Sequence, residues 1–551
     1  MDTKDRSKRI EEIAVELTKE LSVVDTVGEL DSIRRVHEIF SELDYYKENP
    51  QDLRYIDLND SLGRKSLLTI LRGRKGDSKR TVIMIGHTDT VGIADYGTLK
   101  EYANKPYELT EKLKEIAHTI PEEAKKDLES GDYLFGRGLF DMKTGDAIII
   151  ALMEEISKDL ESFEGNLIFA AVCDEEGNSS GMLAVVPELV KLQEQEGFEY
   201  LALIDTDYMT SEFPGDENKY LYVGTVGKLM PSFYVVGKET HVGEAFKGLD
   251  PNHISSAIIN RINLNTDFCD VAHGEVSLPP ISLKQRDLKG EYSVQTARTA
   301  TVFFNYSTHI STPDEVLDKM IKAAEEAFQA TLDSLNHQYE SYCSMTKRKF
   351  TPIPYKARVM SYEELCSRLK DEMGEEFYFR LSEITAAILQ GEALDEREFA
   401  LKLVEEVHNL WSDKNPVIIV YYTPPYYPHV FIEGKDPKEK ALLETVEEAV
   451  SSTKWEYKVV YKKFFPYISD LSYGSAPKDP KIIRTLKDNM PGFGTKYKLP
   501  LEDMQKLHLP VMNIGPFGKD AHKFTERIEK KYSFEVAPEL LYKTLMNLLS
   551  S

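Results

Sequence analysis

Short apolar runs alternate with longer amphipathic segments in the first part of the chain, and this alternation restricts the fold most strongly. The runs that predict buried strands are 67–71, 81–85, 166–173 and 200–205, and the segments that predict helices are 146–156 and 182–194. An earlier amphipathic helix is indicated by Ile10, Ile13, Ala14, Leu17 and Leu21. Strands that alternate with helices favour an α/β fold with a mixed, mainly parallel sheet flanked by helices.

Polar side chains follow several of the predicted strands. His87 and Asp89 come after 81–85, Glu175 and Glu176 follow 166–173, and Asp205 ends 200–205. In such sheets ligands bind beyond the carboxyl ends of the strands. Because strand side chains alternate with period two, His87 and Asp89 point to the same side, so that one can bind a metal while the other orients it.

Two further candidate ligands lie elsewhere in the sequence. Asp141 stands in a glycine-rich turn, 136–143 (GRGLFDMK), and His522 lies near the C-terminus. Taken singly, each candidate has a simpler interpretation: a loop hydrogen bond, a helix cap or solvated charge. Their recurrence after successive strands favours a shared site, and adjacent carboxylates such as Glu175 and Glu176 would repel each other there unless a cation were present or one were protonated.

Five segments resemble the co-catalytic zinc peptidase family of aminoacylases, carboxypeptidase G, acetylornithine deacetylase and succinyl-diaminopimelate desuccinylase. They are 86–91 (GHTDTV), 136–143, 174–177 (DEEG), Asp205, and 515–518 (GPFG) with His522 and Glu526. They stand in the family's order across nearly the whole chain. The long chain with its helical insertion is most similar to bacterial arginine-utilisation proteins within this family.

The resemblance implies a role for each candidate residue. Asp141 would bridge two Zn²⁺ ions, His87 and Asp205 would complete one ion's ligands, and Glu176 and His522 the other's. Nitrogen and oxygen ligands suit Zn²⁺, with Co²⁺ or Mn²⁺ as alternatives. Glu175 would act as general base and Asp89 would orient His87. The resemblance also implies a cis peptide after Asp141.

The pattern changes near residue 221, where strand, helix, strand and long helix suggest an inserted α+β domain. By resemblance this is a lid and dimerisation domain at 223–428, with a helical insertion at about 345–412, between catalytic segments 1–222 and 429–551. His241, in 235–243 (VVGKETHVG), matches a histidine that stabilises the substrate's carbonyl oxygen in the opposite subunit of relatives. A homodimer is therefore expected.

The match is weaker at the substrate-binding positions. Relatives that bind a substrate carboxylate carry an Asn and an Arg on lid strands, whereas 292–296 (YSVQT) and 303–307 (FFNYS) offer only Gln295 and Asn305. Four tyrosines could line a groove or pack a strand end against the insertion: Tyr421, Tyr422, Tyr426 and Tyr427. Ser469 and Asp470 resemble a Ser-Asp-Ala segment near the family's site.

Composition bounds the partners of the chain. The formal net charge of −25 disfavours nucleic acid and anionic membrane surfaces. Four scattered cysteines do not form a disulfide framework, and the charged N-terminus lacks the apolar core of a signal peptide. The longest apolar run, 147–153, is far shorter than a membrane span of about 20 residues, so a cytoplasmic protein is expected.

These features together predict a dinuclear zinc hydrolase that cleaves an amide bond of a small peptide or an N-acyl amino acid, in arginine or amino-acid catabolism. Two alternatives stay open. One is a peptidase with a broader site for short peptides, and the other is a metal-binding scaffold or regulator that kept the fold without turnover. Glu175 argues against the scaffold, because a protein that only binds metal needs no general base.

Overall fold

The computed structural model describes residues 3–391, 393–453 and 456–550. The chain forms two compact units: the first comprises 1–225, 430–476 and 500–551, and the second 226–429 and 477–499. The domain boundaries expected at 222/223 and 428/429 stay a prediction. They placed 477–499 in the catalytic domain, whereas this segment packs within the second compact unit.

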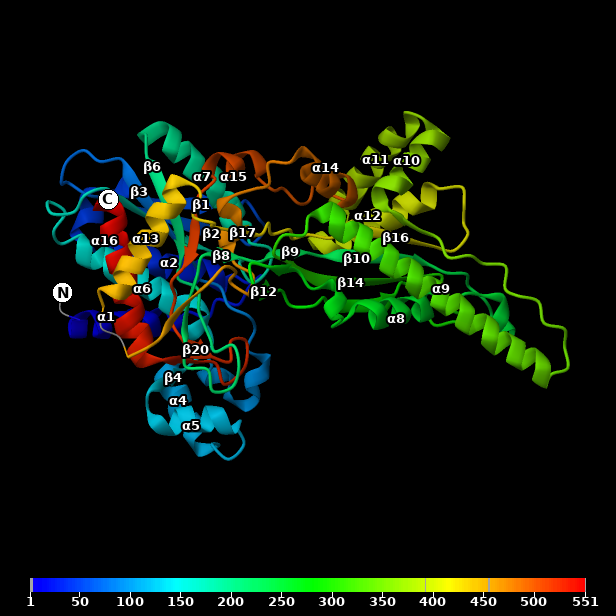
Figure 1. Cartoon of the computed structure of the whole chain (residues 1–551), viewed down its shortest axis with the longest axis horizontal. Helices are drawn as coiled ribbons and strands as arrows, with labels where there is room; N and C mark the ends of the chain where they lie inside the picture. The colour runs from blue at the N-terminus through cyan, green and yellow to red at the C-terminus, as the bar shows by residue number, and fades with distance from the viewer. Residues whose placement is uncertain (1–2, 392, 454–455, 551) are drawn as a thin grey trace. The chain divides into compact units, whose positions relative to one another are not determined.

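An eight-stranded mixed sheet forms the centre of the first unit (Figure 1). Its order is β1 (Leu53–Asp57), β2 (Lys65–Arg72), β5 (Asn166–Val172), β3 (Arg80–His87), β6 (Glu199–Asp205), β19 (Val511–Asn513), β7 (Lys219–Tyr222) and β18 (Val459–Lys462). The central strands β5, β3, β6 and β19 are parallel, whereas β1, β2 and β7 introduce antiparallel pairs. The expected mixed α/β fold is therefore confirmed.

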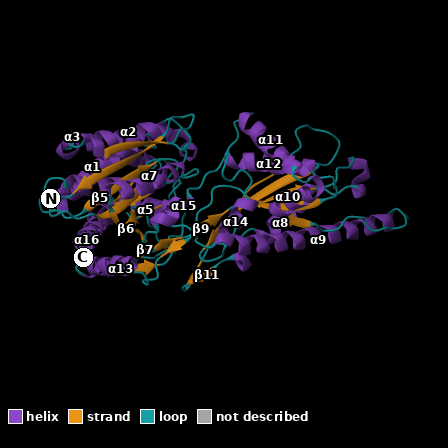
Figure 2. Cartoon of the chain, turned by 90° about the horizontal axis from the view of Figure 1, so that it is seen from above, coloured by secondary structure: helices purple, strands orange, loops and turns teal. Residues whose placement is uncertain are grey.

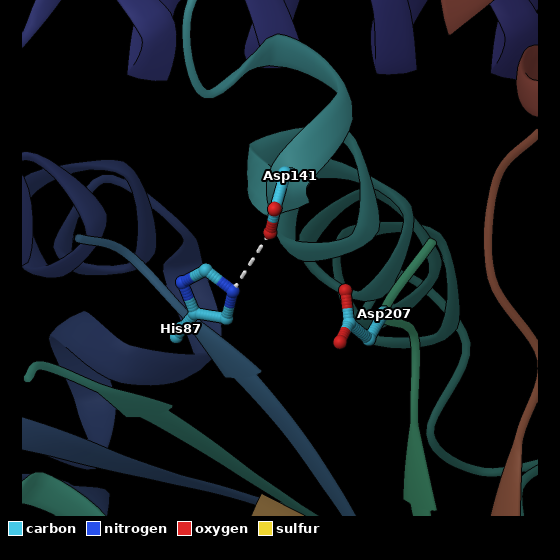
Figure 3. A group of neighbouring side chains, drawn as sticks. All are labelled: His87, Asp141 and Asp207. Carbon is cyan, nitrogen blue, oxygen red and sulfur yellow. Dashed lines mark hydrogen bonds and ion pairs between the residues drawn. The ribbon is translucent and has the colours of Figure 1, made fainter. Parts of the chain in front are cut away.

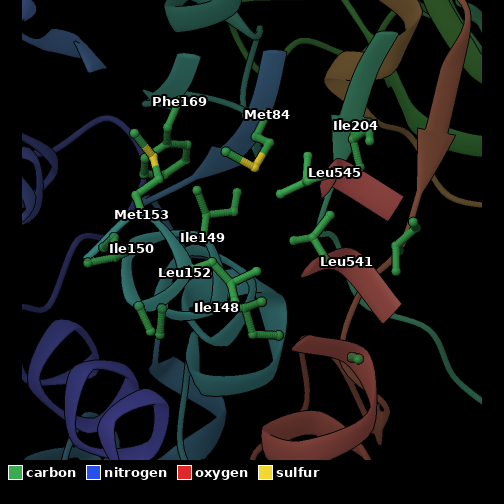
Figure 4. Close-up of a cluster of buried hydrophobic side chains, with 14 of the residues drawn as sticks. Met84, Ile148, Ile149, Ile150, Leu152, Met153, Phe169, Ile204, Leu541 and Leu545 are labelled. Carbon is green, nitrogen blue, oxygen red and sulfur yellow. The ribbon is translucent and has the colours of Figure 1, made fainter. Parts of the chain in front are cut away.

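Helices from both ends of the chain build the main core of this unit. The helices are α1 (Thr3–Lys19), α2 (Gly28–Ser41), α6 (Thr144–Ile156), α13 (Pro437–Ser451) and α16 (Ala537–Ser550). In Figure 4, side chains of α6 and of α16, including Leu541 and Leu545, gather with Met84 and Phe169 from the sheet. Burial of this apolar surface stabilises the sheet whose strand ends carry the polar residues.

Smaller helices complete the first unit. Helix α7 (Ser180–Glu196) packs on the sheet and on α15 (Leu501–Leu507), and α3 (Asp44–Glu48) follows α2. Helices α4 (Pro106–Glu115) and α5 (Glu122–Ser130) form a satellite cluster around β4 (Tyr133–Phe135), which pairs with β21 (Arg527–Glu529). Among the residues described, no helix combines the length and apolar character needed to cross a bilayer.

A second sheet organises the second unit (Figure 2). Its order is β13 (Ile281–Asp287), β14 (Thr299–Thr308), β10 (Pro231–Val236), β16 (Val417–Tyr422) and β15 (Val359–Ser361), with β9 (Gly227–Leu229) beside β14. The helices are α8 (Pro251–Ile262), α9 (Pro313–Met345), α10 (Tyr362–Met373), α11 (Glu376–Gln390), α12 (Glu396–Leu410) and α14 (Pro480–Asn489). Helices α10, α11 and α12 pack with β16 around Trp411.

Two features of the insertion differ from the sequence prediction. The apolar pattern within the expected helical insertion predicts one helix over 362–389, but the structure has two, because Gly374 adopts a positive φ of 64° between α10 and α11. The strand β15 also lies inside the segment expected to be helical. The tyrosines at 421, 422, 426 and 427 are at most 4% exposed. They therefore pack in the interior, as one of the two interpretations predicts, and do not line an open groove.

Candidate metal centre

The turn that carries Asp141 is fixed by a buried glutamate. Glu526 Oε1 accepts hydrogen bonds from the backbone N–H groups of Gly138 (2.8 Å), Phe140 (3.4 Å) and Asp141 (3.4 Å). Glu526 Oε2 accepts from the Arg137 guanidinium at 2.5 Å. The Asp141–Met142 peptide is cis, as the family resemblance implies. The backbone of the turn that presents the Asp141 carboxylate is thus held by Glu526, which lies 385 to 388 positions later in the chain than the residues it binds.

The first group of candidate ligands joins the ends of two strands to this turn. His87, the last residue of β3, places Nε2 3.1 Å from Asp141 Oδ1. Asp207, just beyond β6, completes the group, in which one ligand atom from each residue lies within 4.8 Å of the others. Figure 3 shows the three side chains converging, and all are buried.

The second group shares Asp141 with the first. His522 Nε2 lies 2.9 Å from Asp141 Oδ2 and 2.8 Å from Glu176 Oε1. One ligand atom from each of these three residues again lies within 4.8 Å of the others. Asp141 thus offers Oδ1 to His87 and Oδ2 to His522, which is the arrangement expected of a carboxylate between two metal ions.

Asp205 lies outside both groups, although the sequence analysis assigned it as a ligand. Its Oδ2 accepts a hydrogen bond from Ser469 Oγ at 2.7 Å, and its Oδ1 accepts one from the backbone N–H of Asp207 at 3.2 Å. Asp207, which lies in the first group, was not among the ligands predicted from the sequence. The available signal was the Asp205-Thr206-Asp207 spacing, which repeats that of His87 and Asp89.

Asp89 connects the segment that carries His87 with the segment that carries Glu175 and Glu176. Its carboxylate accepts hydrogen bonds from the backbone N–H groups of Glu175 (3.2 Å) and Glu176 (3.0 Å). The ring nitrogen His87 Nδ1 lies 3.1 Å from the Asp89 carbonyl oxygen and 3.7 Å from its carboxylate. Asp89 therefore positions the two glutamates directly, and it contacts His87 mainly through its backbone.

Glu175 lies beside the first group without belonging to it. Its Oε2 is 3.9 Å from His87 Nε2, and its buried Oε1 has no hydrogen-bond partner within the described part of the chain. Burial raises the pKa of Glu175 well above its ordinary value, and nearby Asp470 and Glu176 add to this. A carboxylate with one unused buried oxygen is suited to accept a proton.

The charges of the site fit bound cations. Burial and the neighbouring carboxylates of Asp141 and Asp205 raise the pKa of Asp207 well above its ordinary range. Burial opposes ionisation of Asp141 as well, but the imidazoles of His522 and His87 lower its pKa overall. Several carboxylates thus lie beside the buried imidazole of His87 and the exposed imidazole of His522, and N/O donors of this kind compensate their charge by binding divalent metals.

His241 belongs to the second unit, where it precedes the turn Val242–Lys247 and is exposed. Its Nδ1 accepts a hydrogen bond from the backbone N–H of Gly243 at 3.1 Å. In the neutral imidazole the proton then resides on Nε2, which is left as a donor. The role of His241 toward a substrate stays a prediction.

Residues 83–547 match the family model described as Peptidase family M20/M25/M40. The chain belongs to this family. It is 35% identical over 548 residues to Protein RocB of Bacillus subtilis (strain 168), with 99% of this chain and 96% of that protein covered. It is also 24% identical over 269 residues to a succinyl-diaminopimelate desuccinylase of Polynucleobacter necessarius, which covers 48% of this chain and 61% of that protein.

Solved structures agree on the fold of this M20 chain. An M20 family metallo-carboxypeptidase from Sulfolobus solfataricus aligns over 100% of both chains with a TM-score of 0.53 at 11% identity. Aminopeptidase PepT from Bacillus cereus ATCC 10987 aligns over 99% of both with a TM-score of 0.51 at 13% identity. The family resemblance read from the sequence is confirmed, and the chain is a metal-dependent hydrolase of the amide-cleaving M20 family.

Proposed function

We propose that the chain is a dinuclear zinc hydrolase that cleaves an amide bond of a small peptide or N-acyl amino acid, in arginine or amino-acid catabolism. The observation that carries the proposal is Asp141, whose two oxygens face two separate ligand groups. His87 and Asp207 would bind one ion with Asp141, and Glu176 and His522 the other. Co²⁺ or Mn²⁺ could be held by the same N/O donors.

The protein's own groups would handle the proton of the reaction. Bound divalent ions polarise a carbonyl and lower the pKa of water. Glu175 would take a proton from the attacking water on its unpartnered Oε1 and return it to the leaving amine. Asp89 would keep Glu175 and Glu176 in place through their backbone N–H groups.

Glu175→Gln tests the proposal. We expect hydrolysis of N-acyl amino acids and dipeptides to fall by a factor of about 10² to 10⁴, because the proton acceptor is lost, while metal content stays unchanged. Hydrolysis rates and elemental analysis of the purified protein measure the two quantities. Glu161→Gln, an exposed glutamate in a loop of the same unit, is the control and should match the wild type in both.

The same experiment separates the alternatives. Full metal content without hydrolysis of any substrate by the wild type would favour the scaffold, and unchanged hydrolysis in Glu175→Gln would refute the role of Glu175. Comparable rates on dipeptides that differ at either end would favour the broader peptidase. The missing lid Arg leaves that possibility open, because only Gln295 and Asn305 stand at the corresponding segments.

His241 would act across a homodimer, its Nε2–H donating to the substrate's carbonyl oxygen as negative charge develops there. Mixing Glu175→Gln and His241→Ala subunits tests this. Neither variant alone should be active, but a mixed dimer contains one site with Glu175 in its own chain and His241 from the partner. Recovery of activity on mixing supports action across subunits, and failure to recover in confirmed mixed dimers contradicts it.

A further inference from the structure

A pocket separate from the candidate metal centre opens in the first unit, with a volume of about 620 Å³. None of the candidate metal ligands lines it. Four aromatic side chains are among the residues that line it: Tyr133, Phe213, Tyr457 and Phe517. A volume of this size accommodates a small organic molecule, and aromatic walls are typical of such sites. We call it the Lys219 pocket after the cation within it.

Lys219 brings a buried positive charge into this pocket. The residue is only 5% exposed, and its Nζ lies 3.8 Å from the centre of the Phe517 ring. The closest oxygen acceptor is the carbonyl of Glu217 at 3.4 Å, and no carboxylate of the described residues lies within 4.0 Å. An ammonium has three donors, so most of its hydrogen-bonding capacity is unused.

The Phe517 ring compensates this burial only in part. An ammonium over a ring is attracted to it, and the carboxylates of Glu529, Asp216 and Glu217 also favour its charge, although none of them forms an ion pair with it among the described residues. Burial nevertheless lowers the pKa of Lys219. A carboxylate placed against Nζ would supply both the missing charge and the missing acceptors.

The other charges around the pocket are engaged or lie at its mouth. Lys519 pairs with Glu123 (2.9 Å) and Asp127 (3.0 Å). The Asp216 carboxylate accepts hydrogen bonds from its own turn, including the N–H of Asn218 at 3.0 Å. Glu217 is exposed and lines the same pocket, as do Glu456 and Lys458, so the exposed part of the lining carries charges of both signs.

We propose that the Lys219 pocket binds a free amino acid with an aromatic side chain. The carboxylate binds Lys219 Nζ, the ammonium lies toward Glu217, and the ring packs among Tyr133, Phe213 and Tyr457. A zwitterion provides a partner for both Lys219 and Glu217. The site is distinct from the metal centre, and it does not depend on the function proposed for that centre.

Calorimetric titration of the metal-loaded full chain with three matched probes tests the assignment. L-phenylalanine carries both charges, 3-phenylpropionate lacks the ammonium, and phenethylamine lacks the carboxylate. We expect L-phenylalanine to bind most tightly and phenethylamine to bind at least about tenfold more weakly, because the charge-assisted hydrogen bond to Lys219 is lost. Absence of L-phenylalanine binding at 10 mM, or equal affinity for phenethylamine, would overturn the proposal.

Two variants locate the binding. Lys219→Met should weaken L-phenylalanine binding by at least about tenfold, whereas Lys458→Met, at an exposed lysine lining the same pocket, should leave it within about twofold. Unchanged affinity in Lys219→Met would place the ligand elsewhere. If Lys219→Met does not fold, the exposed Glu217→Gln decides: it should weaken L-phenylalanine binding toward that of 3-phenylpropionate without changing the latter, and no change refutes the pose.

Discussion

Asp205 and Asp207 stand two residues apart at the end of β6, and the structure gives them different partners. Asp205 is still in the strand and is held by Ser469, while Asp207 lies past the strand end and turns toward His87 and Asp141. The Asp205 carboxylate also accepts the backbone N–H of Asp207. Asp205 thus supports the segment from which Asp207 reaches the metal site.

The isosteric variants Asp205→Asn and Asp207→Asn separate these roles. We expect Asp207→Asn to lose one of the two proposed metal ions on dialysis against a mild chelator, because an amide is a poor substitute for a carboxylate ligand. Asp205→Asn should keep both ions and weaken metal affinity by about 10- to 100-fold at most, as loss of a supporting contact does. Elemental analysis per chain measures the outcome, and the reverse pattern would restore Asp205 as the ligand.

Sequence patterns predicted most of the candidate ligands but not the residues that support them. His87, Asp141, Glu176 and His522 were predicted because each stands in a strand-end or turn motif, and all four lie in the two candidate groups. Alternation with period two holds only while the chain is extended, so it could not say which aspartate after β6 faces the site. The contacts of Glu526 with the Asp141 turn were also out of reach, since they depend on the folded backbone.

At the scale of elements, apolar periodicity predicted the main strands and helices of both units. The structure differs from the prediction where the periodic pattern is short or weak. β15 has three residues and is defined by its parallel pairing with β16, which lies nearly 60 residues later in the chain. The break between α10 and α11 depends on one glycine within a continuous helical pattern. Neither a long-range pairing nor a backbone angle is visible in periodicity.

Gly374→Ala tests whether the break between α10 and α11 requires a glycine. Gly374 has φ 64° and ψ −142°, a region essentially restricted to glycine, and an added Cβ would meet no atom within 4 Å. The cost is therefore backbone strain, which we expect to destabilise the second unit by about 1–3 kcal/mol. Gly290→Ala, another open position in that unit but without positive φ, should be nearly neutral. Urea unfolding compares them, and equal stabilities would contradict the assignment.

At the scale of the whole molecule, chain order alone could not show that 477–499 returns to the second unit. The segment is recognisable there by long-range contacts. The Asn489 side chain accepts the backbone N–H of Glu363 at 3.0 Å, and the Tyr497 hydroxyl accepts that of Tyr426 at 3.2 Å. The second unit is thus completed by a segment that comes after 430–476, which belongs to the first unit. The chain therefore passes back into each unit after it has entered the other.

Two histidines, the buried His408 and the partly buried His429, make the second unit sensitive to acid. Burial is the main cause that lowers the pKa of His408 and of His429 from 6.5 to about 4. Lys414, Arg298 and Arg358 lower that of His408 further, against the opposing effect of Asp413; for His429, His309 acts in the same direction, against Asp270 and Glu315. In the unfolded chain both imidazoles take up protons below pH 6.5, whereas in the folded unit they do so only near pH 4.

The free energy of unfolding of this unit should therefore fall by about 3 kcal/mol for each histidine as the pH drops from about 6.5 to about 4. Below about pH 4 the two histidines should cause no further decrease. Trp411, whose ring lies 6.4 Å from that of His408, reports the transition by fluorescence in a Trp455→Phe background. His408→Leu should remove about half of this pH dependence and leave the part due to His429, whereas His337→Leu, at an exposed position on α9, should retain all of it. Parallel pH profiles for both variants would show that His408 is not the acid-sensitive group.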